Sequence, residues 1–133
     1  MRRIAVPALA MTAVLFGTAL TGTAFAAPAR TKVVGDCQHA QYKPKTITVF
    51  CDQTLILTRI SYTSWGRNVA KGADRTFQDN CRPSCAAGKG IVHRDRFTLD
   101  RPKTERGVRV FTRVRIYRAG KLFKTYPLSS PTS

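Results

Sequence analysis

Apolar and polar residues alternate most clearly near the C-terminus, between Val108 and Tyr117. Five β-branched residues fall on one face of this segment. The residues on the opposite face are Arg109, Phe111, Arg113, Arg115 and Tyr117. A period of two residues is that of a β-strand, and we expect the β-branched face to point toward the core. The pattern therefore predicts a strand whose outer face carries three arginines and two aromatic rings.

Two segments further upstream predict a β-hairpin. Thr46–Cys51 alternates and is rich in β-branched residues, whereas Leu55–Tyr62 begins with apolar residues on both faces, which is typical of a central strand. Two more strands are predicted, one over Ile91–Asp100 and ended by Pro102, the other over Leu122–Leu128.

The stretch from Gly66 to Gly90 shows neither a helical nor a strand period. It contains several glycines and Pro83, and it is predicted to be one long loop with Trp65 as an apolar anchor at its base. Loops of this length in compact domains are commonly functional or held by a cross-link. Trp65 and Arg82 are therefore candidate contact residues of a loop site, although the interpretation we favour is that Trp65 only fills the core.

Five short strands and no convincing helix predict an all-β fold. We expect a small disulfide-stabilised β-sandwich, with a small barrel as the alternative. The predicted organisation is a signal peptide over residues 1–26, a flexible N-terminal segment over 27–41, a single β domain over 42–128 and a loose tail over 129–133.

The first 26 residues have the three parts of a secretory signal peptide. Met1-Arg2-Arg3 is basic, Ile4–Leu20 is apolar and uncharged, and Ala24-Phe25-Ala26 is a small-x-small cleavage site. A retained membrane anchor is the alternative, but the apolar run is short for a span of roughly 20 residues. The arginine pair hints at twin-arginine export, although its neighbours favour the general route. The sequence therefore predicts a protein that is extracellular or envelope-associated, with no membrane span after cleavage.

Four cysteines in a small exported chain indicate two disulfide bonds. We favour the pairs Cys37–Cys51 and Cys81–Cys85, while the other two pairings remain open on sequence alone. The cysteine spacing is poor for a zinc finger or ribbon, and a catalytic thiolate would be oxidised in this compartment. No metal or cofactor is therefore expected.

Several short motifs follow one another between Cys37 and Leu99. They are Tyr42-x-Pro44-x-x-Ile47-x-Val49-x-Cys51-Asp52, Ile60-x-Tyr62-x-Ser64-Trp65-Gly66, Ala70-x-Gly72 and Cys81-x-Pro83-x-Cys85-Ala86-x-Gly88. Together they resemble a family of small exported proteins of actinobacteria. The resemblance implies a secreted or surface-held β domain and no particular activity. The chain departs from that family in its high content of arginine and lysine and in having Asp52-Gln53 in place of Asp-Gly, so a partner shared with more neutral relatives does not follow.

Positive charge is the strongest physical signal. The chain has a formal charge of +16, which falls to about +14 when residues 1–26, with Arg2 and Arg3, are removed. Such a charge attracts polyanions, and the attraction weakens with salt. The candidate binding residues are Arg94, Arg96, Arg109, Phe111, Arg113, Arg115 and Tyr117.

Basic residues among aromatic rings suit phosphate contact and base stacking. They also suit teichoic acids, acidic glycans and anionic lipid head groups, and the alternative is a solvated face that keeps the protein soluble. Because no nucleic-acid-binding motif is present, nucleic acid is a less favoured partner than another anionic polymer or a cell-surface component.

An enzyme is the alternative from another class of function. His39, His93 and Glu105, together with the arginines, are the residue types of a small secreted ribonuclease, in which two groups transfer protons and arginine stabilises the phosphorane. Their spacing forms no motif, and neither a serine-hydrolase elbow nor a phosphate loop is present.

The sequence therefore predicts a monomeric, non-catalytic binding or structural module at the cell envelope or in the extracellular space. A ribonuclease is the second hypothesis. A secreted inhibitor that acts through the Cys81–Cys85 loop is the third.

Overall fold

The computed structural model describes residue 17 and residues 29–132. Apart from Gly17, the predicted signal peptide lies outside the described residues. The described part is all-β, as predicted, and has two disulfide bonds. Its strands are β1 (Val33–Val34), β2 (Ala40–Gln41), β3 (Ile47–Thr48), β4 (Leu55–Trp65), β5 (Ala70–Asp79), β6 (Gly90–Glu105), β7 (Val108–Arg118) and β8 (Lys121–Pro127).

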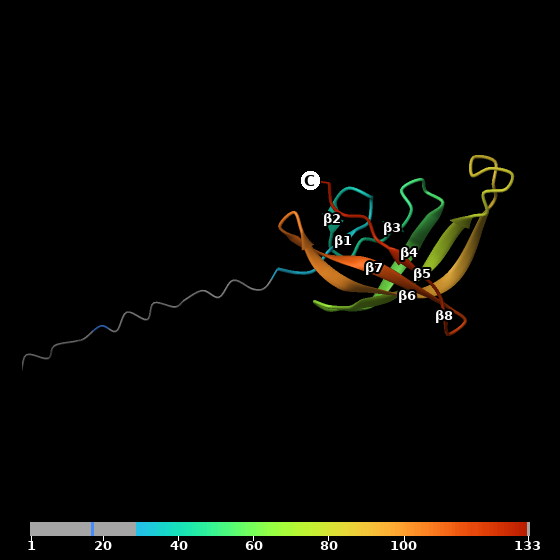
Figure 1. Cartoon of the computed structure of the whole chain (residues 1–133). Helices are drawn as coiled ribbons and strands as arrows, with labels where there is room; N and C mark the ends of the chain where they lie inside the picture. Colours follow the sequence, from blue (N-terminus) through green and yellow to red (C-terminus); the bar gives the residue numbers. More distant parts are fainter. Residues whose placement is uncertain (1–16, 18–28, 133) are drawn as a thin grey trace, which may run out of the picture.

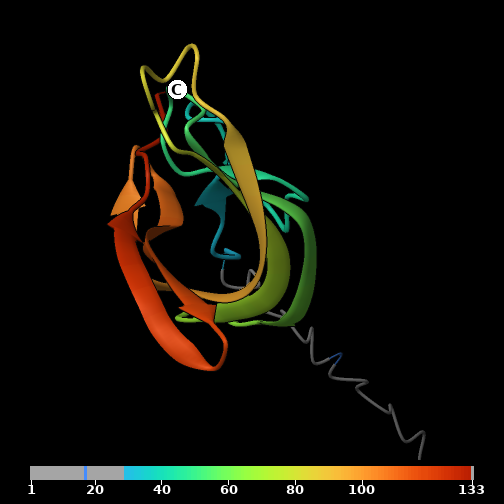
Figure 2. The same ribbon diagram turned by 90° about the vertical axis from the view of Figure 1, so that its right-hand side faces the viewer.

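Six of the strands form one antiparallel sheet in the order β3-β4-β5-β6-β7-β8, so that each strand pairs with its neighbour in the sequence. The long strands bend, and the sheet curls into a half-barrel, as Figures 1 and 2 show. The strands β1 and β2 form a separate two-stranded sheet. The predicted hairpin is confirmed as the pairing of β3 with β4.

Two register shifts in β4 explain why its apolar residues do not alternate strictly. The first lies between Thr58 and Ser61, where Arg59 has a positive φ of 49°, and the second lies between Tyr62 and Ser64. Each extra residue exchanges the two faces of the strand. The side chains that pack in the core therefore come from Leu55, Leu57, Ile60, Tyr62 and Trp65.

The N-terminal segment packs between β4 and β7, which are not neighbours in the sheet. Trp65 Nε1 of β4 donates a hydrogen bond to the Thr31 carbonyl oxygen over 2.9 Å, and Lys32 exchanges backbone hydrogen bonds with Arg109 and Phe111 of β7. Thr31 and Val33 are buried. The segment was predicted to be flexible, but residues 31–35 pack against the core, because their hydrogen bonds join two strands that are distant in the sheet. Asp36, Gln38 and His39, further along the segment, are exposed.

The prediction of a long loop over residues 66–90 was wrong. Most of the first half of this stretch is β5, which pairs with β6 from Ala70↔Leu99 to Asp79↔Gly90. Its core-facing residues are Ala70, Gly72, Asp74 and Thr76. Small and polar residues on the buried face leave no hydrophobic alternation in the sequence, so the strand could not be recognised by its period. The connection between β5 and β6 is only the segment 80–89.

Two further boundaries differ from the sequence prediction. Pro102 does not end its strand, since β6 continues to Glu105. The partner β5 pairs with β6 no further than Leu99, so Pro102 lies on a free edge, where a residue without an N–H is tolerated. The tail, predicted to be loose, is held at Thr132, whose N–H donates to the Gln38 carbonyl over 2.9 Å.

Both predicted disulfide bonds are confirmed. Cys37 is bonded to Cys51, which ties the β1–β2 region to the residues after β3, and Cys81 is bonded to Cys85 within the β5–β6 connection. No free cysteine is present in the described residues. Disulfides of this kind form and persist in an oxidising environment.

Candidate anion-binding groove

The face of the sheet opposite the core carries a row of residues across four strands. Ser61 of β4 lies opposite Ala73 of β5, which lies opposite Arg96 of β6, which in turn lies opposite Tyr117 of β7. Side chains at paired positions share one face of a sheet. Because Ser61 and Ala73 are small and Arg96 and Tyr117 are large, the row is low over β4 and β5 and high over β6 and β7.

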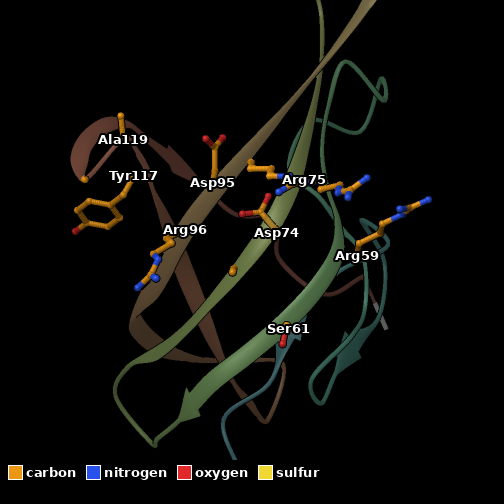
Figure 3. A pocket seen from close by; sticks show the side chains of 11 residues that line it. Arg59, Ser61, Asp74, Arg75, Asp95, Arg96, Tyr117 and Ala119 are labelled. Atoms are coloured by element: carbon orange, nitrogen blue, oxygen red, sulfur yellow. The ribbon is translucent and has the colours of Figure 1, made fainter.

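Two adjoining hollows, with volumes of about 680 and 470 Å³, share Ala73, Arg96, Tyr117 and Gly120. The larger extends over Arg59, Arg75 and Arg94, and the smaller extends over Lys71 and Thr98. The buried residues Asp74 and Asp95 also line the larger hollow. In Figure 3, Arg96 and Tyr117 lie at one side of the larger hollow and Arg59 lies at the other. We refer to the two hollows together as the basic groove.

Five basic side chains border the basic groove. They are Arg59, Lys71, Arg75, Arg94 and Arg96. Four of them are exposed and Arg75 is half-buried. Within the described residues, salt bridges join only His39 to Asp36, Arg113 and Arg115 to Asp100, and Arg118 to Asp95. The five groove cations therefore have no carboxylate partner among the described residues.

Strand alternation explains why these cations lie unpaired next to acidic residues. Asp74 stands between Ala73 and Arg75, and Asp95 stands between Arg94 and Arg96, so both carboxylates point to the core while their neighbours point to solvent. Asp74 and Asp95 are only 5% and 4% exposed. The same two strands thus place negative charge inside and positive charge outside.

The buried carboxylates differ in their partners. The Arg118 guanidinium donates two hydrogen bonds of 2.9 Å to Asp95. Asp74 accepts one hydrogen bond of 2.8 Å from the Thr76 hydroxyl, and its Oδ1 has no hydrogen-bond partner among the described residues. Burial raises the pKa of Asp74 to about 7, and the nearby Asp95 charge acts in the same direction. Burial alone would raise the pKa of Asp95 too, but the hydrogen bonds from Arg118, the Thr76 hydroxyl and the nearby positive charge together outweigh burial, and the pKa is lowered.

Three of the predicted binding residues, Arg94, Arg96 and Tyr117, line the groove. Arg115 lies on the same face in the row Lys71–Thr98–Arg115. Its Nε is 3.3 Å from an Asp100 oxygen, and Arg113 makes a bidentate contact of 2.7 Å with the same carboxylate. These hydrogen bonds from Arg113 hold the pKa of Asp100 below its usual range. Arg113 and Arg115 are therefore partly neutralised.

The other predicted residues lie elsewhere. Arg109 donates to Thr31 Oγ1 over 3.2 Å and to Asn68 Oδ1 over 2.7 Å, away from the groove. Phe111 is fully buried, because the N-terminal segment and Trp65 pack against it.

The two residues of the predicted loop site are far apart in the fold. Trp65 ends β4, and its ring packs edge-on against Tyr62 and Phe111 at centroid separations of 5.0 and 5.5 Å. Arg82 is exposed in the β5–β6 connection, where Asn80 Oδ1 accepts hydrogen bonds from the N–H groups of Arg82 and Lys89. Trp65 thus packs against core rings, whereas Arg82 is exposed on the connection.

Sequence reasoning missed Arg59, Lys71 and Arg75 because it did not place them on strand faces. A signal was present in Lys71, Ala73 and Arg75, which alternate with the core-facing residues of β5. The matching sequences Ala73-Asp74-Arg75 and Arg94-Asp95-Arg96 on paired strands carry the same pattern.

The three residues of the ribonuclease hypothesis come from separate places. His39 lies before β2 and contacts Asp36 over 2.7 Å. His93 and Glu105 lie on one strand, β6, twelve residues apart, which is roughly 40 Å of extended chain. No group of three or more His, Cys, Asp or Glu side chains suited to a metal ion occurs among the described residues.

The part of the chain that the structure describes contains no helix long and apolar enough to cross a membrane. Comparison of the chain with models of protein families, with curated proteins and with solved structures found no match.

Proposed function

We propose that the protein is a secreted, non-catalytic module that binds anionic polymers through the basic groove. The observation that supports this proposal is the set of five cations around two adjoining hollows, without carboxylate partners among the described residues. Export is supported by the two disulfide bonds and by the signal peptide that the sequence predicts.

Burial of the acidic residues strengthens the field over the groove. Asp95 is neutralised by Arg118, and Asp74, with a pKa of about 7, is partly protonated at neutral pH. Asp95 with its partner therefore adds no net charge, and Asp74 offsets only part of the charge of the arginines on the opposite face of the same strands. The exposed charged side chains around the hollow are all basic, and an excess of one sign of charge over a hollow concentrates ions of opposite charge and raises their rate of association.

Rigidity also supports a binding role. The groove residues lie on the central strands β4, β5 and β6; β5 is paired on both sides over the groove, and β6 is paired on both sides from Arg96 onward. A site on a paired sheet needs little ordering when a ligand binds, which lowers the entropic cost of association.

The enzyme hypothesis receives less support. The separation of His93 from Glu105 along β6, and the contact of His39 with Asp36 near the small sheet, do not form a pair of proton-transfer groups around one substrate. The inhibitor hypothesis remains a prediction that involves the Cys81–Cys85 loop and not the groove.

A binding experiment tests the proposal. The disulfide-bonded protein is applied to immobilised heparin, RNA and a neutral glycan over a series of salt concentrations. We expect retention on both polyanions that falls steeply with salt, and no retention on the neutral glycan. The double variant Arg94→Gln/Arg96→Gln should lose most of this retention.

The matched control is Arg82→Gln/Lys89→Gln, which removes the same charge from the exposed β5–β6 connection. Equal weakening by the two double variants would show that net charge alone is responsible and would refute the groove as the site. Cleavage of the RNA that disappears in His93→Ala would support the ribonuclease instead.

A further inference from the structure

We infer that the basic groove recognises an extended phosphodiester chain by its backbone, with the chain running along β6. This inference rests on the proposed function and names the chemical class of the polymer. It is drawn from the spacing of the cations, from their chemistry and from the nature of the groove floor.

The spacing of the cations along β6 is set by the strand. Arg94, Arg96 and Thr98 are successive residues on one face, so their positions are about 6.6 Å apart. Arg75 lies opposite Arg94, and Lys71 lies opposite Thr98. Each of these three positions along β6 therefore has a cation, either on β6 itself or directly opposite on β5. This interval is close to the separation of successive phosphates in an extended sugar–phosphate or polyol–phosphate backbone.

Four of the five groove cations are arginines. A guanidinium presents a planar fork of donors that matches two oxygens of one phosphate, whereas a lysine acts as a point charge. Arg75 and Arg94, on adjacent strands at directly opposed positions, could contact the two free oxygens of the same phosphodiester. The guanidinium groups thus lie at positions where they would contact successive phosphates.

The floor of the groove favours a narrow chain with its charge in the backbone. The floor residues are Ser61, Ala73 and Thr98, whose side chains are short. A polymer that carries its charges on flexible side chains would lose rotamer freedom on binding, while a phosphodiester backbone carries its charges directly. Ser61 and Thr98 also present hydroxyl groups to the oxygens of such a backbone.

Few aromatic rings are available for base stacking. Of the residues that line the two hollows, only Tyr117 and Phe97 are aromatic, and Phe97 is buried in the core. Proteins that bind single strands through their bases use a succession of exposed aromatic rings. A single half-buried tyrosine cannot supply this, so recognition is by the phosphates and not by the bases.

Three oligomers of twelve repeats test the inference when their affinities are measured by fluorescence anisotropy on the same preparation: oligothymidylate, an abasic deoxyribose-phosphate chain and oligoglutamate. We expect the two phosphodiester chains to bind with dissociation constants within about threefold of each other, and oligoglutamate to bind at least about tenfold more weakly. Arg96→Gln should weaken both phosphodiester chains by the same factor, and Arg82→Gln should leave both unchanged.

The failures of the inference and of the proposed function are distinguishable. Oligoglutamate binding as tightly as the phosphodiesters would overturn the ligand class and leave polyanion binding intact. Loss of more than tenfold in affinity with the abasic chain would overturn recognition by the backbone. Absence of salt-dependent binding to any of the three chains, together with no retention on heparin, would overturn the proposed function and this inference with it.

Discussion

Asp74 and Asp95 lie directly opposite each other on β5 and β6, both on the core side of the sheet, and of the two only Asp95 is ion-paired within the described residues. Two adjacent carboxylates in a buried site cannot both be ionised at low cost. The Arg118 guanidinium favours the charge on Asp95, and burial together with that charge keeps Asp74 protonated up to about pH 7. This difference between the two carboxylates should make the stability of the domain depend on pH.

We predict that the free energy of unfolding falls as the pH rises from 5 to 8. The pKa of Asp74 is about 7 in the folded protein, against an ordinary value of 3.8. Between these values the folded state holds a proton that the unfolded chain releases, so a rise in pH favours unfolding. The loss is on the order of 3 kcal/mol, from about 1.4 kcal/mol for each pKa unit. Urea denaturation at pH 5, 6, 7 and 8 measures it.

The variant Asp74→Asn should flatten this dependence and be more stable than the natural protein at pH 8. His93 lies on the same face of β6 as Asp95, so His93→Gln is the control and should retain the fall. Below about pH 4 the free energy of unfolding should instead fall as the pH falls. Protonation of Asp95, whose pKa is lowered, then removes its ion pair with Arg118. A fall between pH 5 and 8 that persists in Asp74→Asn would contradict the assignment.

Removal of Arg118 should destabilise the domain strongly. The Asp95 side chain has no exposed surface, so Arg118→Met leaves a buried charge without its partner, which costs about 3–5 kcal/mol. The substitution also removes the stacking of the Arg118 guanidinium on the Phe123 ring, at 4.0 Å from its centroid. Thermal unfolding followed by circular dichroism measures the loss.

The comparison for Arg118 is Arg113→Met. Asp100, the partner of Arg113, is partly exposed and keeps a second contact with Arg115 at 3.3 Å. Arg113→Met should therefore destabilise the domain much less than Arg118→Met. Equal losses for the two variants would show that the buried Arg118–Asp95 pair contributes no more to stability than the partly exposed Arg113–Asp100 pair.

The sequence was sufficient to predict the fold class, the hairpin of β3 and β4, and both disulfide bonds. It could not reveal β5, because period-two recognition depends on apolar residues on the buried face, and β5 buries Gly72, Asp74 and Thr76 there. What fills the core at this point is a neighbour: the Phe97 ring of β6 covers Gly72. When the side chains of a neighbouring strand fill the core over a strand, that strand needs no apolar residues of its own and shows no hydrophobic pattern.

The candidate site was predicted in part for a related reason. Arg94 and Arg96 could be assigned to one face of a predicted strand because they are two residues apart, and Tyr117 to an outward face because it alternates with β-branched residues. Phe111 was assigned by the same alternation and is buried, because the N-terminal segment adds a second packing partner at that end of β7. A strand face can be covered by a segment that is distant in the sequence. The alternation of residues within the strand gives no information about such a segment.

Gly72 should tolerate no side chain. A Cβ at this position would lie 2.7 Å from the Ser61 carbonyl oxygen and 2.8 Å from Phe97 Cζ, so either the backbone of β4 or a core ring must move. We expect Gly72→Ala to destabilise the domain by about 1–3 kcal/mol. Chemical denaturation measures this cost, and Ala73→Ser, one residue away on the open face, is the control. A stability equal to that of the control would mean that β4 and β5 are less closely packed than the structure shows.

A carboxylate placed on the groove floor should abolish binding without loss of stability. Ala73 lies between Ser61 and Arg96 in the row across the sheet, and Arg75 and Arg94 border the same hollow. In Ala73→Glu the new charge would be attracted to these arginines, occupy the hollow and reduce the positive field. Since cross-strand pairs of opposite charge are favourable, the melting temperature should stay the same or rise. Retention on heparin at moderate salt should be lost.

The matched control is Ala86→Glu, which introduces the same charge at an exposed position of the β5–β6 connection. It should reduce retention only slightly, because the interaction of a distant charge is screened beyond roughly 10 Å in 0.1 M salt. If Ala73→Glu and Ala86→Glu reduce retention equally while both remain folded, the polyanion does not bind in the groove. If only Ala86→Glu reduces it, the contact surface is the disulfide-closed connection, where Arg82 and Lys89 supply the positive charge, and the loop hypothesis replaces the groove.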